Sequence, residues 1–137
     1  MSVDKEETLS VRTPLDVERA RRLVRRFAFD AGLRSGPAEE LVLAASELVN
    51  NIVKHRASEG KITCRHSGSA TSRAVEVFVR DEGPGITDLA KALEDGYTTS
   101  HGLGSGLPAA RRLVDSFEID SGAQGTTVRL LKNVSHV

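Results

Sequence analysis

Residues 73–85 read RAVEVFVRDEGPG, an alternating stretch that ends in an acidic, glycine-containing turn. Apolar residues fall on every second position at Val75, Val77 and Val79, which predicts a strand over Arg73–Arg80 with one face against a core. The chain before it shows apolar residues at helical spacing, so this strand is expected to lie in a sheet that helices cover. We therefore expect an apolar, core-facing strand that is followed directly by a polar segment.

Asp81 follows that strand and has the same parity as its valines, so its carboxylate should point toward their face. A carboxylate there needs a partner, and the N–H groups of an adenine amino group would provide one. Gly83 and Gly85 would let the backbone approach a flat base closely. An ordinary turn is the alternative, because Asp, Pro and Gly are common turn residues.

Two amphipathic helices are predicted before this strand. The first begins at Thr13-Pro14, with Thr13 as the N-cap, and stops near Gly32. The second runs from Ser35 to about Arg56. The other expected elements are strands over Glu7–Arg12, Lys61–His66, Phe117–Ser121 and Thr126–Leu131, and a helix over Leu107–Ser116. This order predicts an α+β two-layer sandwich, in which helices cover one face of a mixed, mainly antiparallel sheet.

The second helix carries a polar row formed by Glu47, Asn51 and His55, which lie four residues apart and so share one helix face. A carboxylate beside a carboxamide suits a site for magnesium and phosphate. Asn51 could give an oxygen to the cation, and Glu47 could hold a water or accept a proton from an attacking hydroxyl. A solvent-facing polar stripe is the alternative.

A third candidate is Gly102-Leu103-Gly104-Ser105-Gly106-Leu107, placed just before the last predicted helix. Backbone N–H groups at a helix N-terminus bind phosphate well, and glycines leave them accessible. The segment is no P-loop, because no Gly-Lys-Ser/Thr follows. A flexible linker is the alternative, although a stretch of about 20 residues without periodicity, Asp81–Gly106, is typical of a functional loop.

Taken together, the three motifs and the later Gly125-Thr126-Thr127 resemble the GHKL (histidine-kinase/Hsp90-like) ATPase superfamily across nearly the whole chain. The resemblance implies binding of ATP and Mg²⁺. It makes Glu47 the general base, Asn51 the magnesium ligand, and Asp81 the adenine-binding residue with Thr126 in support. Thr126 has the same parity as Val128 and Leu130 in the last predicted strand, so it is expected on the core face as well. The nucleotide-loop positions that it implies are Gly83, Gly85, Gly102, Gly104, Gly106 and the adjoining Leu107.

Within that superfamily, the run from Asp95 to Leu113, DGYTTSHGLGSGLPAARRL, resembles the RsbT-type switch kinases, which are relatives of the SpoIIAB and RsbW anti-sigma-factor kinases. This resemblance implies phosphorylation of a serine or threonine on a STAS-domain antagonist in a bacterial partner-switching pathway. It also implies activation of a PP2C-type phosphatase by binding. The alternatives are an anti-sigma factor kinase that sequesters a sigma factor and a non-catalytic ATP-binding interaction module.

Composition narrows the remaining classes of function. A length of 137 residues fits one domain, and the equal numbers of basic and acidic residues, 19 each, argue against nucleic acid as a partner. The chain has neither an apolar run of membrane-spanning length nor a signal-peptide pattern, so a cytoplasmic protein is expected. The lone Cys64 is expected to be a small core residue rather than a nucleophile.

Overall fold

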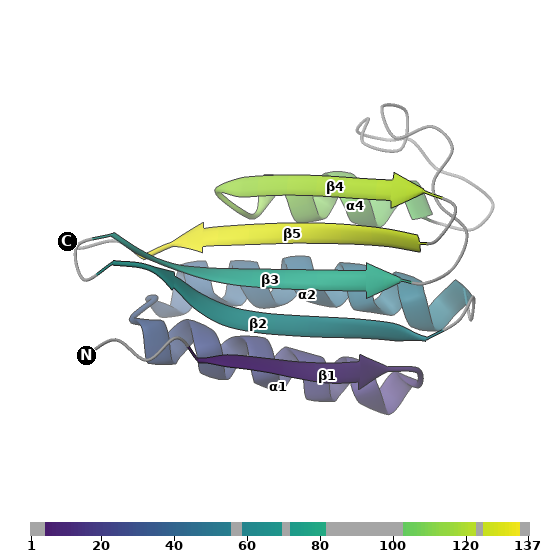
Figure 1. The fold of residues 1–137 in the computed structure, drawn as a ribbon, viewed down its shortest axis with the longest axis horizontal. Coiled ribbons are helices and arrows are strands. Elements are labelled where there is room, and N and C mark those ends of the chain that lie inside the picture. The colour runs from purple at the N-terminus through teal and green to yellow at the C-terminus, as the bar shows by residue number, and fades with distance from the viewer. Residues whose placement is uncertain (1–4, 56–58, 70–71, 82–102, 123–124, 135–137) are drawn as a thin grey trace.

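A computed structural model describes residues 5–55, 59–69, 72–81, 103–122 and 125–134. Its sheet has strand order β1-β2-β3-β5-β4, and every described pairing is antiparallel. The strands are β1 (Glu6–Val11), β2 (Gly60–Gly68), β3 (Arg73–Asp81), β4 (Ser116–Gly122) and β5 (Gly125–Asn133). The edges of the sheet are therefore β1 and β4 (Figure 1). No parallel pair joins the described strands, so the sheet is antiparallel rather than mixed.

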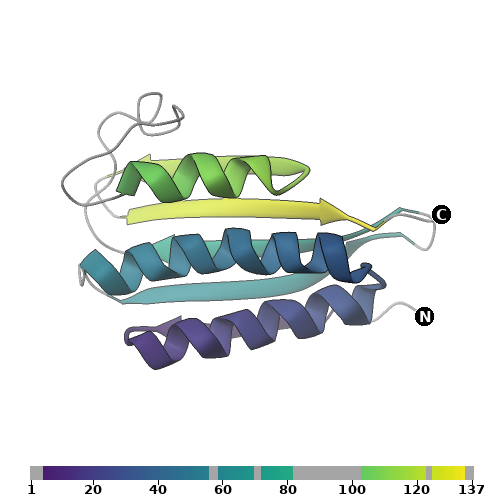
Figure 2. The same ribbon diagram turned by 180° about the vertical axis from the view of Figure 1, so that it is seen from behind.

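Three helices, α1 (Pro14–Ala31), α2 (Ser35–His55) and α4 (Leu103–Arg112), cover one face of this sheet. Figure 2 shows them side by side, with α2 between α1 and α4. None of the described helices lies over the opposite face, which we call the helix-free face (Figure 1). The two-layer α+β sandwich predicted from the sequence is confirmed.

Local signals explain where α1 begins and ends. Thr13 is its N-cap and Pro14 its first residue, and the Asp16 carboxylate accepts hydrogen bonds from the backbone N–H groups of Arg12 (2.8 Å) and Thr13 (3.1 Å). Those bonds hold the pKa of Asp16 below its usual range. At the other end Gly32 takes a left-handed conformation with φ 103°, which glycine adopts without strain.

The core lies between the helices and the sheet. Val75, Val77 and Val79 of β3 are buried, as their parity predicts. From the helices it receives two apolar stripes: Ala20, Val24, Phe27 and Ala31 of α1, and Leu41, Ala45, Leu48 and Ile52 of α2. These contacts hold both helices against the sheet.

Several boundaries differ from those expected, most clearly in the β2–β3 pair and in the last helix. The β2–β3 hairpin is longer, because β2 continues to Gly68 and β3 includes Asp81. The last helix lies earlier, at Leu103–Arg112 instead of Leu107–Ser116. The helix ends early because Asp115 already bonds to β5. The backbone N–H of Asp115 donates to the Leu131 carbonyl at 2.9 Å, and its carboxylate accepts from the backbone N–H of Asn133 at 2.7 Å. The chain is therefore already on the sheet at Ser116.

The helix-free face carries a group of paired charges that we call the open-face cluster: Arg65, Glu76, Arg129 and Glu118. Glu76 is nearly buried and accepts hydrogen bonds from Arg65 and Arg129, each at 2.6 Å. Arg129 also donates to the exposed Glu118 at 3.1 Å. Burial raises the pKa of Glu76, but the two guanidinium groups outweigh that effect and hold this pKa below its ordinary value.

Candidate nucleotide-binding site

Four segments meet at one end of the sandwich: the end of α2, the end of β3, the start of β5 and the start of α4 (Figures 1 and 2). Asp81 is the last residue of β3 and lies directly opposite Thr126 in the antiparallel register. The sequence predicted that both residues share a face with the core, and this pairing places them side by side. Both side chains are half-buried.

The structure adds Ser121 of β4 to this pair. Ser121 lies opposite Thr126 on its other side, and the two hydroxyl oxygens are 2.7 Å apart, a hydrogen bond. Asp81, Thr126 and Ser121 thus form one row across β3, β5 and β4, which we call the polar row. Sequence reasoning missed Ser121, although its parity matches that of Phe117 and Ile119 on the same strand.

The polar row replaces an apolar pattern. Its neighbouring row along the same three strands is Val79, Val128 and Ile119, and the row beyond that is Val77, Leu130 and Phe117. Hydrophobic side chains therefore fill these two rows, and a carboxylate and two hydroxyls follow in the last row at this end of the sheet. A half-buried wall with polar groups at one end of an apolar surface is typical of a site for a flat ligand that has a few hydrogen-bonding groups.

The end of α2 packs against this end of the sheet. Gly60 of β2 lies opposite Asp81, and a Cβ on Gly60 would stand 2.7 Å from the Ile52 side chain. No larger residue fits at position 60 unless Ile52 moves. This close approach brings the second half of α2, which carries Glu47 and Asn51, near the polar row.

Glu47 and Asn51 are one turn apart on α2, and both are half-buried. The amide nitrogen of Asn51 is buried and has no hydrogen-bond partner among the described residues. A buried amide nitrogen without a partner costs about 1–3 kcal/mol, so this N–H group is a candidate donor to a bound phosphate, while the amide oxygen of Asn51 is the candidate ligand for a cation. His55 is the last residue of α2, and its side chain lies outside what the structure describes.

The glycine-rich segment has a different place from the one expected. Gly104 and Gly106 lie within the first turn of α4 and not ahead of it. The first four N–H groups of a helix lack partners within the helix, so the backbone of residues 103–106 itself offers the donors and the positive end of the helix dipole. Leu107 is buried beneath this turn and fixes it to the core. The predicted positions Gly83, Gly85 and Gly102 lie outside the described residues.

These groups fit a magnesium nucleotide. The polar row offers hydrogen bonds to a base, and the first turn of α4 offers N–H groups to phosphates. No group of three or more His, Cys, Asp or Glu side chains that could hold a metal occurs among the described residues. The side-chain oxygen of Asn51 could be one protein ligand of a magnesium ion, which commonly binds through few protein ligands plus substrate phosphates.

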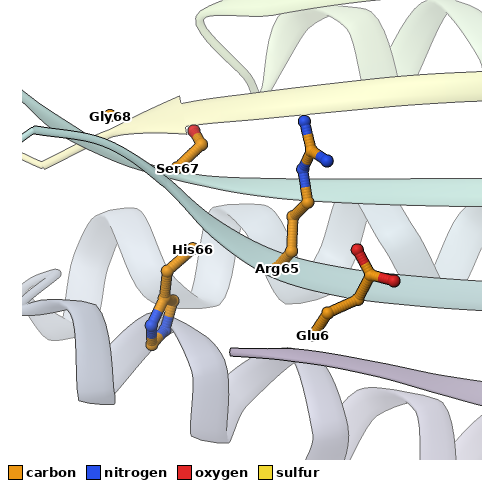
Figure 3. A pocket seen from close by; sticks show the side chains of 5 residues that line it. All are labelled: Glu6, Arg65, His66, Ser67 and Gly68. Atoms are coloured by element: carbon orange, nitrogen blue, oxygen red, sulfur yellow. The ribbon is translucent and has the colours of Figure 1, made fainter. Parts of the chain in front are cut away.

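Two other features lie apart from this end. A polar pocket lined by Glu6, Arg65, His66, Ser67 and Gly68 is found at the far end of β2 (Figure 3). There His66 points toward α1, where its Nε2 lies 2.9 Å from the carbonyl oxygen of Phe27. None of the predicted site residues lines this pocket. Cys64 is buried in the core, and burial raises the pKa of its thiol to about 12, which makes it a core residue and a poor nucleophile.

Comparison with known families identifies the class to which this arrangement belongs. Residues 11–132 match the histidine kinase-like ATPase domain family. Because that match covers most of the chain, the protein belongs to this family. Its solved relatives include the RsbU and RsbW domains of a Mycobacterium tuberculosis protein, with a TM-score of 0.62, 21% identity, and coverage of 93% of this chain and 32% of that one. This likeness supports the fold.

Two curated relatives narrow the class. The chain is 34% identical over 131 residues to the serine/threonine-protein kinase RsbT of Bacillus subtilis, covering 95% of this chain and 98% of that protein. It is 36% identical over 103 residues to the anti-sigma F factor of the same organism, covering 70% and 69% of the two chains. No described helix is both long enough and apolar enough to cross a bilayer.

Proposed function

We propose that this protein is an ATP-dependent serine/threonine protein kinase that phosphorylates a STAS-domain antagonist in a bacterial partner-switching pathway. The observation that carries the proposal is the similarity to a serine/threonine kinase along nearly the whole chain, together with the polar groups that gather at one end of the sandwich. Binding of a PP2C-type phosphatase is a further part of the proposal. The reaction takes place in the cytoplasm, where ATP is supplied.

Each element of the site has a part in phosphoryl transfer. The Asp81 carboxylate accepts N–H groups of the base, and Thr126 supports it. The first turn of α4 binds phosphate oxygens, which need donors in fixed positions. Asn51 ligates Mg²⁺, which when bound offsets the charge on the phosphates. Glu47, one turn away on α2, receives the proton of the attacking hydroxyl.

The partner supplies that hydroxyl, so transfer requires the partner to reach Glu47. Glu47 is half-buried on the helix layer and not deep in the core, which leaves it accessible from outside. A second candidate function is that of an anti-sigma factor kinase, because the chain also matches an anti-sigma F factor at 36% identity. That match covers a smaller share of the chain than the match to the switch kinase does.

The proposal is tested by transfer of labelled phosphate from ATP to STAS-domain proteins encoded in the same genome. We expect Glu47→Ala to reduce transfer by roughly 100-fold or more, with nucleotide affinity retained. Glu39→Gln is the matched control, since Glu39 lies on the same helix and is exposed, bonded to Arg25. Transfer at the normal rate by Glu47→Ala would show that the base assignment is wrong.

A pull-down with sigma factors separates the two candidate functions. A switch kinase should phosphorylate its STAS-domain partner and leave sigma factors unbound. Retention of a sigma factor by the wild-type protein in the presence of ATP would favour the anti-sigma function instead.

A further inference from the structure

The polar row contains one side chain that no role above explains. Ser121 lies on β4, two strands away from Asp81, yet its hydroxyl hydrogen-bonds with that of Thr126 at 2.7 Å. It is half-buried and stands in line with the apolar Ile119 and Phe117. Its parity places it on the same face of the sheet as Thr126 and Asp81.

A hydroxyl has one proton to donate and two lone pairs that accept. Between two hydroxyls, one must be the donor, and that choice sets what the other presents to a third group. If Ser121 donates to Thr126, the Thr126 proton is free to point elsewhere. If Thr126 donates to Ser121, it presents only lone pairs.

Adenine requires the first arrangement. Its amino group donates and is matched by the Asp81 carboxylate, while its neighbouring ring nitrogen accepts and needs a donor. Asp81 cannot be that donor when ionised. Thr126 lies beside Asp81 in the register, so its hydroxyl is the nearest donor on the sheet, directly or through one water.

We infer that Ser121 is a positioning residue that determines base specificity: its hydroxyl donates to Thr126 and thereby fixes the Thr126 proton toward the acceptor nitrogen of adenine. Hypoxanthine presents an N–H at that ring position and a carbonyl in place of the amino group. A site held in the adenine arrangement rejects it, because two donors or two acceptors then face each other. This inference rests on the proposed function.

Loss of Ser121 should relax that selectivity. Without its partner, the Thr126 hydroxyl rotates and accepts or donates as the base demands. We expect Ser121→Ala to lower the preference for ATP over ITP by roughly tenfold, mainly through weaker ATP binding. Ser121→Thr keeps the hydroxyl and should retain most of the preference.

The test is calorimetric titration of the full chain with ATP and with ITP, both with Mg²⁺. Ser116→Ala is the matched control, because Ser116 starts the same strand on the helix-free side. The expected result is a reduced ATP-to-ITP affinity ratio in Ser121→Ala, a near-normal ratio in Ser121→Thr and in Ser116→Ala, and similar melting temperatures throughout.

An unchanged ratio in Ser121→Ala would overturn the inference, and so would an equal loss of both nucleotides, which indicates a structural role. Asp81→Asn distinguishes this failure from failure of the proposed function. If Asp81→Asn loses ATP while Ser121→Ala is normal, only the Ser121 inference is wrong. If Asp81→Asn binds ATP as the wild type does, the base pocket is not at the polar row and the Ser121 inference is wrong, whereas the proposed kinase function fails only if the wild-type protein transfers no phosphate.

Discussion

Two buried polar groups on opposite sides of the sheet, Glu76 of β3 and Asn51 of α2, differ in how fully they are paired. On the helix-free face, Glu76 has a guanidinium on each side, and both oxygens of its carboxylate accept short hydrogen bonds. On the helix-covered side, the amide nitrogen of Asn51 is buried without any partner among the described residues.

This difference indicates what each region is for. A buried charge that is fully paired adds to the uniqueness of a fold and leaves nothing for a ligand to bind. A buried amide left unpaired weakens the free protein, and its N–H group is available to a ligand that can accept it. A mutation at Glu76 should therefore lower stability and leave nucleotide binding unchanged, whereas a mutation at Asn51 should lower binding without lowering stability.

The largest expected effect is on binding, at Asn51. Replacement of this residue by leucine removes the unpaired amide, so we expect nucleotide affinity with Mg²⁺ to fall by roughly 10- to 100-fold. The free energy of unfolding of the free protein should stay the same or rise by about 0.5–1 kcal/mol. Calorimetry and urea denaturation measure the two quantities.

Asn50→Leu is the control for that substitution, because Asn50 is the exposed neighbour on the same helix. It should change neither nucleotide affinity nor stability appreciably. A clear loss of stability in Asn51→Leu would mean that the amide is already satisfied in the free protein, and the contrast between the two faces would disappear.

The next effect is on stability, at Glu76. Glu76→Gln keeps the shape and removes the charge, so Arg65 and Arg129 lose their shared carboxylate. We expect a loss of about 1–3 kcal/mol in the free energy of unfolding, with ATP affinity unchanged. Glu118→Gln, at the exposed end of the same cluster, should cost less than about 0.5 kcal/mol. Equal effects of the two substitutions would show that burial of Glu76 has no energetic role.

The smallest effect is the pH dependence of the difference in unfolding free energy between the wild type and Glu76→Gln. The pKa of Glu76 lies below its ordinary value of 4.5, so the unfolded chain takes up the proton first as the pH falls. The stabilisation from Glu76 is fully present above pH 4.5 and is lost as the pH falls through the lower pKa of the folded protein. The gap in unfolding free energy between wild type and Glu76→Gln should therefore close on acidification. A gap that widened in acid would contradict the assignment.

Much of the architecture follows from local patterns. Alternation in β3 and the cap signals at Thr13, Pro14 and Gly32 place their elements to within a residue or two. Parity alone was enough to put Asp81 and Thr126 on the core face. Their direct pairing needed the register of β3 against β5, which no local pattern contains.

The features that sequence reasoning missed are those set by contacts between distant segments. Glycines disfavour helix, so the start of α4 was expected after Gly106, but packing of Leu107 and Ala110 into the core extends the helix back to Leu103. Glu76 has the parity of a solvent-facing residue. It is buried because arginines from two neighbouring strands lie over it, and the strand order that brings them there spans most of the chain.

The open sheet has a further consequence for the protein in a crowded solution. Its edge strands, β1 and β4, leave backbone N–H and C=O groups that could recruit another chain into a continuous sheet. On their helix-free sides these strands carry Glu6, Thr8 and Ser10, and Ser116, Glu118 and Asp120. Charged side chains at both borders repel an approaching copy of the same strand. The alternation that places apolar side chains of each edge strand in the core thus also places charged side chains on the other side, where they oppose aggregation through the sheet edges.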